Sequence, residues 1–186
     1  MKIGIFYATN TGFTEEVAEK IYSKLGPNVV AACQNIEDRT IDEMLGYDVL
    51  LLGIATWDAG DLPYDWALFY DDLDKYDFTS TRVVMFGLGD QVGYPETFLD
   101  AMGIVYRKFL EQGAIGDLGF WPTAAYEYFD SLAVYEDKFC GLAIDEDNEP
   151  ELTDDRIDKW CAQIVRGLGI LQVCSETAET AKTATA

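Results

Sequence analysis

The sequence predicts an α/β protein whose five-stranded, doubly wound parallel sheet lies between two layers of helices. Short apolar runs that suit buried strands alternate along the chain with segments whose apolar residues recur at helical spacing. Alternation of this kind favours parallel strands joined by right-handed crossovers. The chain has 186 residues, of which 49% are hydrophobic, so it can bury the core of one such domain.

Five apolar runs are expected to form the strands of the sheet. The run VLLLGIA at residues 49–55 is apolar on both faces, as a central parallel strand should be. The fifth strand begins at residues 114–119, is interrupted by an aromatic-rich insertion at 121–139 and resumes at 139–144. The other strands are predicted at residues 2–7, 29–35 and 82–87.

The segments between these runs are expected to be helical. In the first of them Val17, Ile21 and Leu25 lie one turn apart and mark the buried face. The helices are predicted at residues 11–25, 41–45, 64–73, 94–112 and 153–167. We therefore assign residues 1–169 to one domain and expect the Thr-, Ala- and Glu-rich residues 170–186 to form a flexible tail.

The composition of the chain excludes several classes of function. With 34 acidic and 13 basic residues it has a net charge of −21, so nucleic acids and anionic membrane surfaces would repel it. The absence of histidine removes Ser-His-Asp and Cys-His nucleophile systems and most zinc sites. The four cysteines form no CxxC pair, and scattered reduced thiols without a signal peptide or a membrane-spanning apolar run fit a cytoplasmic protein.

Polar loops follow the first, third and fourth predicted strands. Ligands of a doubly wound sheet bind outside the carboxyl ends of the strands, so these loops should lie together at one edge. The first loop leads into a helix and offers hydroxyls, an amide and unpaired N–H groups to an anion, although it could also be an ordinary helix cap. Its residues are Thr9, Asn10, Thr11, Gly12, Phe13 and Thr14. It lacks Lys, Arg and both common nucleotide fingerprints, which favours a terminal monophosphate.

The other two loops offer aromatic side chains and flexible backbone. Trp57 could form one wall for a planar ligand, or it could cover the edge of the core. Tyr94 could form a second wall, or it could simply begin a helix after a glycine-rich loop. Asp90 and nearby backbone N–H groups could read the polar edge of a heteroaromatic ring, because glycines allow the backbone to approach it closely. The residues are Thr56, Trp57, Asp58, Ala59 and Gly60 after the third strand, and Leu88, Gly89, Asp90 and Tyr94 after the fourth.

The three loops together predict a phosphorylated planar cofactor, and their sequences resemble those of long-chain flavodoxins. The stretch TNTGFT at residues 9–14 is similar to the T-x-T-G-x-T phosphate loop of that family. Thr56-Trp57 followed by Gly60 resembles the first flavin loop, and GLGDQVGY at residues 87–94 resembles the second. The interrupted fifth strand resembles the long-chain insertion, and the resemblance covers about residues 1–168.

This resemblance implies a flavodoxin-like fold that binds FMN non-covalently. It implies that residues 9–14 hold the phosphate and that the isoalloxazine ring lies between Trp57 and Tyr94. It also implies ring-edge and ribityl contacts from Gly89, Asp90, Thr97, Asp100 and Asp145. Phe13 departs from the family pattern, which usually has a polar or basic residue at that position.

The resemblance further implies an electron carrier rather than an enzyme. FMN would pass single electrons between redox proteins, with a flavodoxin reductase as donor and an acceptor enzyme, and their basic docking surfaces would match this acidic chain. Residues 57–77 carry a net charge of −6 and residues 145–158 carry −7, which opposes further negative charge on the flavin and predicts a low reduction potential. We expect a monomer that holds no metal.

Two other functions stay open on the same fold. An FMN-dependent NAD(P)H quinone or nitro reductase would need a cleft above the flavin for the nicotinamide, whereas Trp57 and Tyr94 would both cover the ring. A cofactor-free regulatory domain of the receiver type would need an acidic cluster after the first strand, where residues 9–12 are instead TNTG.

Overall fold

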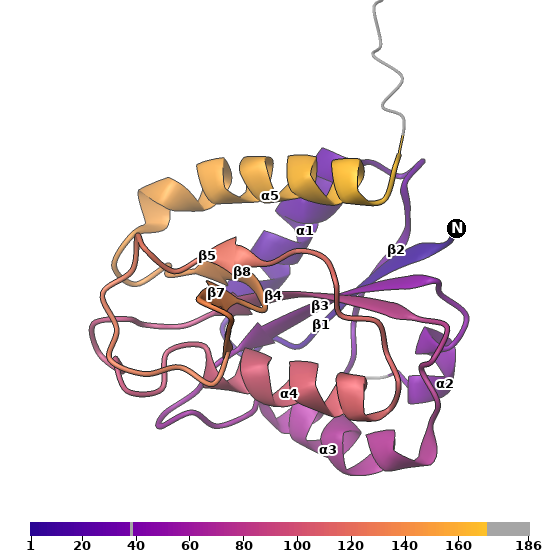
Figure 1. The fold of residues 1–186 in the computed structure, drawn as a ribbon, viewed down its shortest axis with the longest axis horizontal. Coiled ribbons are helices and arrows are strands. Elements are labelled where there is room, and N and C mark those ends of the chain that lie inside the picture. The colour runs from indigo at the N-terminus through magenta and orange to yellow at the C-terminus, as the bar shows by residue number, and fades with distance from the viewer. Residues whose placement is uncertain (38, 171–186) are drawn as a thin grey trace, which may run out of the picture.

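The computed structural model describes residues 1–37 and 39–170, which form a three-layer sandwich around a five-stranded parallel sheet (Figure 1). The strand order is β2-β1-β3-β4-β8. The chain thus adds β2 on one side of β1 and then β3, β4 and β8 on the other side, so the order of strands switches between β1 and β3. This order confirms the predicted doubly wound fold. The strands are β1 (Ile3–Tyr7), β2 (Val30–Asn35), β3 (Val49–Ala55), β4 (Arg82–Leu88) and β8 (Gly141–Ile144).

Two long helices cover each face of the sheet. The helices α1 and α5 lie on one face, and α3 and α4 lie on the other, as Figure 1 shows. Three short elements, α2, η1 and η2, complete the connections. Their bounds are α1 (Phe13–Leu25), α2 (Ile41–Met44), α3 (Tyr64–Asp72), η1 (Leu73–Lys75), α4 (Asp100–Glu111), η2 (Pro150–Leu152) and α5 (Thr153–Gly167).

Each face of the sheet has its own apolar core. Trp66 of α3 is fully buried, and its indole N–H donates to the Gly53 carbonyl at 2.9 Å. On the opposite face Trp160 of α5 is fully buried, and its indole N–H donates to the Gly119 carbonyl at 2.8 Å. Both rings therefore bury a large apolar area without leaving a polar group unpaired.

The predicted interruption of the fifth strand is confirmed, but its first half is shorter than expected. Of residues 114–119, Ile115 alone makes a parallel bridge, to Arg82, whereas β8 pairs with the later part of β4. The chain leaves the sheet after Ile115 because the Gly116 carbonyl accepts a hydrogen bond from the Tyr106 hydroxyl at 2.8 Å. The intervening residues 116–140, called the insertion below, contain a small antiparallel sheet. Its strands are β5 (Trp121–Pro122), β6 (Val134–Tyr135) and β7 (Lys138–Phe139).

The predicted helix at residues 94–112 is wrong over its first turn and a half. The helix α4 begins at Asp100, and residues 94–99 form turns. Pro95 disfavours helical backbone at the preceding Tyr94, and Leu99 has a left-handed φ of 63° that separates these turns from the helix.

Two further expectations concern the C-terminal tail and membrane-spanning segments. Residues 171–186 of the predicted tail lie outside the described residues. Within residues 1–37 and 39–170, the structure contains no helix that is both long enough and apolar enough to span a membrane.

The close approach of the insertion to α4 predicts an unusual response to a glycine substitution. Alanine normally stabilises a helix relative to glycine by about 1 kcal/mol. A Cβ at Gly103 would lie 2.1 Å from the Leu132 carbonyl oxygen, so we expect Gly103→Ala to destabilise the protein by about 1–3 kcal/mol through overpacking. Urea unfolding measures this change.

Gly46→Ala is the matched control, because its Cβ would meet its nearest atom at 3.7 Å. We expect the control to change the free energy of unfolding by less than about 0.5 kcal/mol. A stabilised Gly103→Ala variant would show that the insertion does not pack against α4 in this way.

Candidate functional site

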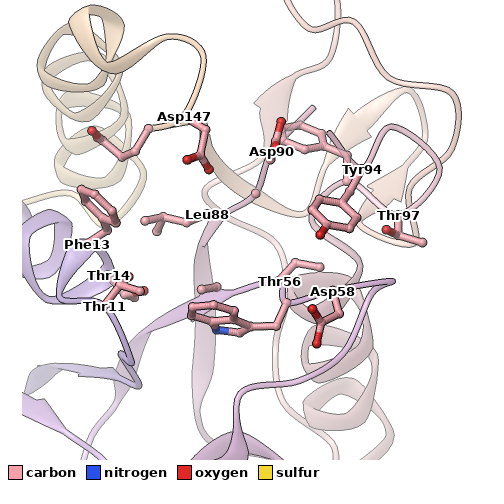
Figure 2. A pocket seen from close by; sticks show the side chains of 15 residues that line it. Thr11, Phe13, Thr14, Thr56, Asp58, Leu88, Asp90, Tyr94, Thr97 and Asp147 are labelled. Atoms are coloured by element: carbon pink, nitrogen blue, oxygen red, sulfur yellow. The ribbon is translucent and has the colours of Figure 1, made fainter. Parts of the chain in front are cut away.

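A cavity of about 360 Å³ opens at the carboxyl edge of the sheet, where the three predicted loops meet (Figure 2). Figure 2 shows Thr11 and Thr14 of the first loop on one side, with Tyr94 and Asp58 of the other loops on the opposite side. This volume is typical of small-molecule sites. The lining residues are Thr11, Phe13, Thr14, Ala55, Thr56, Trp57, Asp58, Leu88, Gly89, Asp90, Tyr94, Thr97, Phe98, Glu146 and Asp147.

The first loop presents the start of α1 to the cavity. Gly12 precedes the helix with a left-handed φ of 96°, and its N–H donates to the Thr9 hydroxyl at 2.9 Å. No side chain among the described residues caps this helix, so its first-turn N–H groups are available to a ligand. Together with the hydroxyls of Thr11 and Thr14, these groups form an anion cradle without a cation.

The second loop is held in a tight turn against the start of α4. The backbones of Trp57 and Asp61 exchange two hydrogen bonds, of 3.0 and 2.7 Å, and Asp58 between them has a left-handed φ of 44°. Gly60 also has a positive φ, of 101°, and a Cβ there would lie 3.1 Å from a carboxylate oxygen of Asp100. The Thr56 hydroxyl accepts a hydrogen bond from the backbone N–H at the start of α4.

The indole of Trp57 forms part of the cavity wall. Its Nε1 atom is buried and has no hydrogen-bond partner among the described residues. An unpaired buried donor is unfavourable, so this atom is consistent with a ligand or a water molecule that supplies an acceptor.

The third loop is shaped by the side chain of Asp90. One oxygen of its carboxylate accepts hydrogen bonds from the N–H groups of Val92 (3.0 Å) and Gly93 (2.6 Å) and from the Asn148 amide (2.8 Å). Burial alone would raise the pKa of Asp90, but these hydrogen bonds outweigh it and hold the pKa below its ordinary value. The turn leads directly to Tyr94, whose ring is 47% exposed at the cavity.

A buried polar network beneath this loop was missed by sequence reasoning. The fully buried Asp145 accepts hydrogen bonds from the backbone and side-chain N–H groups of Gln91, at 3.1 and 2.9 Å. The Gln91 amide also donates to Glu149 at 3.1 Å and accepts from the N–H of Glu127 in the insertion at 2.6 Å. Gln91 therefore joins the third loop to the insertion and to the segment after β8.

The charge around the cavity is acidic. Asp58, Asp90, Glu146 and Asp147 line it, and no Lys or Arg of the described residues does. Burial is the main cause that raises the pKa of Asp147, and the nearby carboxylates of Asp90 and Asp145 raise it further. A ligand that gains negative charge here would therefore be destabilised.

Comparison with known proteins identifies the family of this chain. A family model described as flavodoxin matches residues 5–160, which is most of the chain. The chain belongs to the flavodoxin family.

Curated flavodoxins resemble the chain over nearly their whole length. The flavodoxin of Synechocystis is 47% identical over 163 residues, which are 88% of this chain and 95% of the relative. Flavodoxin 2 of Escherichia coli K12 is 43% identical over 167 residues, 89% of this chain and 95% of the relative. The insertion within the fifth strand agrees with the predicted long-chain type.

Solved flavodoxin structures share the fold. A crystal structure of Fusobacterium nucleatum flavodoxin bound to flavin mononucleotide has a TM-score of 0.83 and 31% identity, and the match covers 89% of this chain and 98% of that one. Oxidised flavodoxin 2 of Bacillus cereus has a TM-score of 0.68 and 27% identity, with 90% and 99% covered.

The structure brings most of the predicted site residues of this flavodoxin together. Those that line the cavity are Thr11, Phe13, Thr14, Thr56, Trp57, Asp58, Leu88, Gly89, Asp90, Tyr94 and Thr97. Those that lie outside the lining are Thr9, Asn10, Gly12, Ala59, Gly60, Asp100 and Asp145. Three of these residues set the backbone of the loops without facing the cavity. The Thr9 hydroxyl accepts from the Gly12 N–H, and Gly60 packs closely against Asp100.

Two of the predicted carboxylate contacts, Asp100 and Asp145, are turned to other partners. Asp100 is buried at the start of α4 and accepts a hydrogen bond from the Leu132 N–H at 2.7 Å. Asp145 is saturated by Gln91 and Asn148. Because its oxygens already accept several hydrogen bonds, Asp145 has little capacity left for a ligand.

Four lining residues were not predicted: Ala55, Phe98, Glu146 and Asp147. Glu146 and Asp147 lie in the loop that follows β8, so the rule that located the other loops at carboxyl strand ends would have found them too. Phe98 is buried among Tyr126, Tyr128 and Phe139 of the insertion, and nothing in its local sequence indicated that contact.

The pairing of Glu149 with Arg156 predicts how stability changes with pH. Burial would raise the pKa of Glu149, but hydrogen bonds from the buried Arg156 (2.5 Å) and from Gln91 outweigh it and lower the pKa below 4.5. Because the folded pKa is depressed, ionised Glu149 stabilises the protein above about pH 4.5 and this stabilisation is lost as the pH falls through the folded pKa. We expect Glu149→Gln to reduce the free energy of unfolding by about 1–3 kcal/mol at pH 7.

The difference between Glu149→Gln and the wild type should shrink when urea unfolding is repeated between pH 5 and pH 3. Glu151→Gln is the control, because Glu151 is exposed and has no ion pair among the described residues. A difference that stays constant over this range would contradict the assignment of the effect to Glu149 ionisation.

Proposed function

We propose that the cavity binds FMN non-covalently and that the bound flavin makes this flavodoxin a low-potential, one-electron carrier between redox proteins. Family membership supports an FMN-based electron carrier. The single observation that carries the proposal is that one cavity joins an uncapped helix N-terminus to two aromatic side chains, Trp57 and Tyr94.

The residues present fit each part of FMN. The first-turn N–H groups of α1 and the hydroxyls of residues 9–14 would hold the phosphate, which needs donors rather than a cation. Trp57 and Tyr94 would lie on either side of the ring, and the unpaired Nε1 of Trp57 is a donor still without an acceptor. The backbone at Gly89 and Asp90, together with Thr97, would meet the polar edge and the ribityl chain.

Two buried carboxylates would act behind the ring rather than on it. In this proposal Asp145 orients Gln91 and Asn148, and Asp100 anchors the insertion through Leu132. Neither needs to touch the flavin to keep the third loop in place. The chemistry of the carrier is supplied by the flavin when bound, and the protein sets its binding and its electrostatic surroundings.

The acidic lining would lower the potential at which the flavin accepts its second electron. Each carboxylate at about 10 Å opposes a new negative charge by roughly 0.4–1.7 kcal/mol before salt screening. This energy corresponds to roughly 20–70 mV for one electron. Asp58, Asp90, Glu146 and Asp147 all line the cavity, so their effects would add.

The proposal also covers the oligomeric state, the location and the partners of the carrier. We infer that residues 1–169 act as one monomeric domain in the cytoplasm and take electrons from a flavodoxin reductase. Partners with basic surfaces fit the net charge of −21, which gives fast, weak and salt-sensitive encounters. The relatives reported above are named flavodoxins, and they offer no support for an NAD(P)H-dependent quinone or nitro reductase.

A redox titration of the reconstituted protein tests the proposed function. We expect one FMN per chain, two separate one-electron steps and a second potential below that of free FMN. Asp147→Asn should raise the second potential by roughly 20–70 mV. Glu111→Gln, at the far end of α4, is the control and should leave it unchanged.

The same preparation separates a carrier from a reductase. NADPH alone should not bleach the flavin until a flavodoxin reductase is added. A protein that binds no FMN, or whose flavin NADPH reduces directly, would overturn the proposal.

Replacement of Trp57 tests the aromatic wall. We expect Trp57→Ala to weaken FMN binding by about 1–3 kcal/mol, the range found when a planar base loses an aromatic stacking partner. The apoprotein should unfold at the same urea concentration as the wild type, because Trp57 is only half-buried. Fluorescence titration with FMN measures the affinity.

Trp57→Phe is the conservative control and should retain part of the affinity. If Trp57→Ala unfolds the apoprotein while its holoprotein keeps the wild-type potentials, Trp57 belongs to the core and the stacking assignment is wrong.

A further inference from the structure

Phe129 in the insertion is the most exposed large apolar side chain of the described residues, with 80% of its surface accessible. Isolated apolar residues on a surface are common and carry no meaning alone. Phe129 differs because the backbone that carries it is held in a fixed position beside the cavity.

Four hydrogen bonds fasten residues 127–131 to the third loop. The N–H groups of Phe129 and Asp130 both donate to the Pro95 carbonyl, at 2.8 and 3.1 Å. The other two bonds run from the Glu127 N–H to the Gln91 side chain and from the Ser131 hydroxyl to the Phe98 carbonyl. The backbone that carries the Phe129 ring is therefore tied to the loop that carries Tyr94.

The third loop adds two further exposed apolar side chains. Val92 is 66% exposed at its tip, and Tyr94 is 47% exposed at the mouth of the cavity. We call Phe129, Val92 and Tyr94 the apolar rim. Three such residues on two mutually bonded segments, next to a binding cavity, are typical of an interaction surface.

The charged side chains that these two segments expose are all acidic. Glu96, Glu127 and Asp130 are exposed on the same two segments. Neither residues 83–106 nor residues 109–137 contain a Lys or an Arg, and Arg107 between them donates to the Leu132 carbonyl of the insertion at 3.0 Å. A complementary surface must therefore combine an apolar recess with basic residues around it.

We propose that the apolar rim, with Phe129 as its anchor, is the docking surface for the redox partner of this carrier, and that the partner presents an apolar recess bordered by Lys or Arg. A second copy of the chain does not fit, because each copy would bring a net charge of −21. This inference rests on the proposed function. It assigns to Phe129, a residue outside the cavity, a role in electron transfer between proteins that does not involve FMN binding.

An aromatic anchor suits this task for a physical reason. Long-range attraction between opposite charges speeds the encounter but leaves many orientations open, whereas a buried aromatic side chain selects one. Because the Phe129 N–H is hydrogen-bonded to Pro95, the residue after Tyr94, burying the Phe129 ring in the partner would bring the mouth of the cavity close to the same partner.

Stopped-flow kinetics with an NADPH-reduced flavodoxin reductase test the proposal on the FMN-loaded protein. We expect Phe129→Ala to lower the second-order rate constant for electron transfer about tenfold. The dissociation constant for FMN, both reduction potentials and the dependence of the rate on salt should stay at their wild-type values, because no charge and no cavity residue has changed. Tyr64→Ala, which removes a 71% exposed aromatic ring from α3, is the control and should leave the rate unchanged.

Replacing two acidic side chains together distinguishes the effect of the Phe129 ring from that of long-range electrostatic attraction. Glu127→Gln combined with Asp130→Asn should flatten the dependence of the rate on salt, which Phe129→Ala leaves intact. Both results together support the proposal.

Two outcomes would overturn it. One is a Phe129→Ala variant that transfers electrons at the wild-type rate. The other is a wild-type dimer in sedimentation that Phe129→Ala dissociates without slowing transfer, which would assign the ring to self-association. A wild-type chain that takes no electrons from the reductase would instead contradict the proposed function itself.

Discussion

The parallel pairing of β1, β3 and β4 is the constraint on which the rest of the site depends. Tyr7 pairs with Gly53, and Ala55 pairs with Leu88, so the three strands end at one edge and release their loops side by side. The helix α1 begins at the same edge, which aims its free N–H groups at the loops that carry the aromatic walls. A slip of one residue in either pairing would turn the buried side chains of a strand to the other face and displace its loop.

The second requirement is a buried carboxylate that joins segments distant in the sequence. Asp145 is held by donors from the third loop and from the turn after β8, while Gln91 extends the same network to the insertion. These hydrogen bonds fix the relative arrangement of three loops, because the loss of any one would leave a buried polar group unpaired. Aromatic packing of Phe98 against Tyr126 and Phe139 adds apolar contact to the same junction.

Much of this arrangement could be predicted from the sequence, because apolar periodicity sets strands and helices and the doubly wound topology sets where their loops meet. The start of α4 could not be located from periodicity, since Leu99 departs from helical backbone while remaining part of the apolar pattern. The role of Asp145 could not be predicted either, because whether a carboxylate faces a ligand or an internal donor depends on Gln91, 54 residues away. Glu146 and Asp147 were noted for their charge but not for their position after a strand.

The division of the outer strand has a consequence for biosynthesis. The edge of β4 is covered partly by Ile115 and partly by β8, and the stretch between them must be made before the sheet can close. During translation, the N–H groups at the start of α1 and the side chains of Trp57 and Tyr94 would therefore be made well before Asp145. The cavity would gain its last lining residues, Glu146 and Asp147, only late in synthesis, with α5 still to follow. A chain that paused before them would offer a flavin an incomplete site.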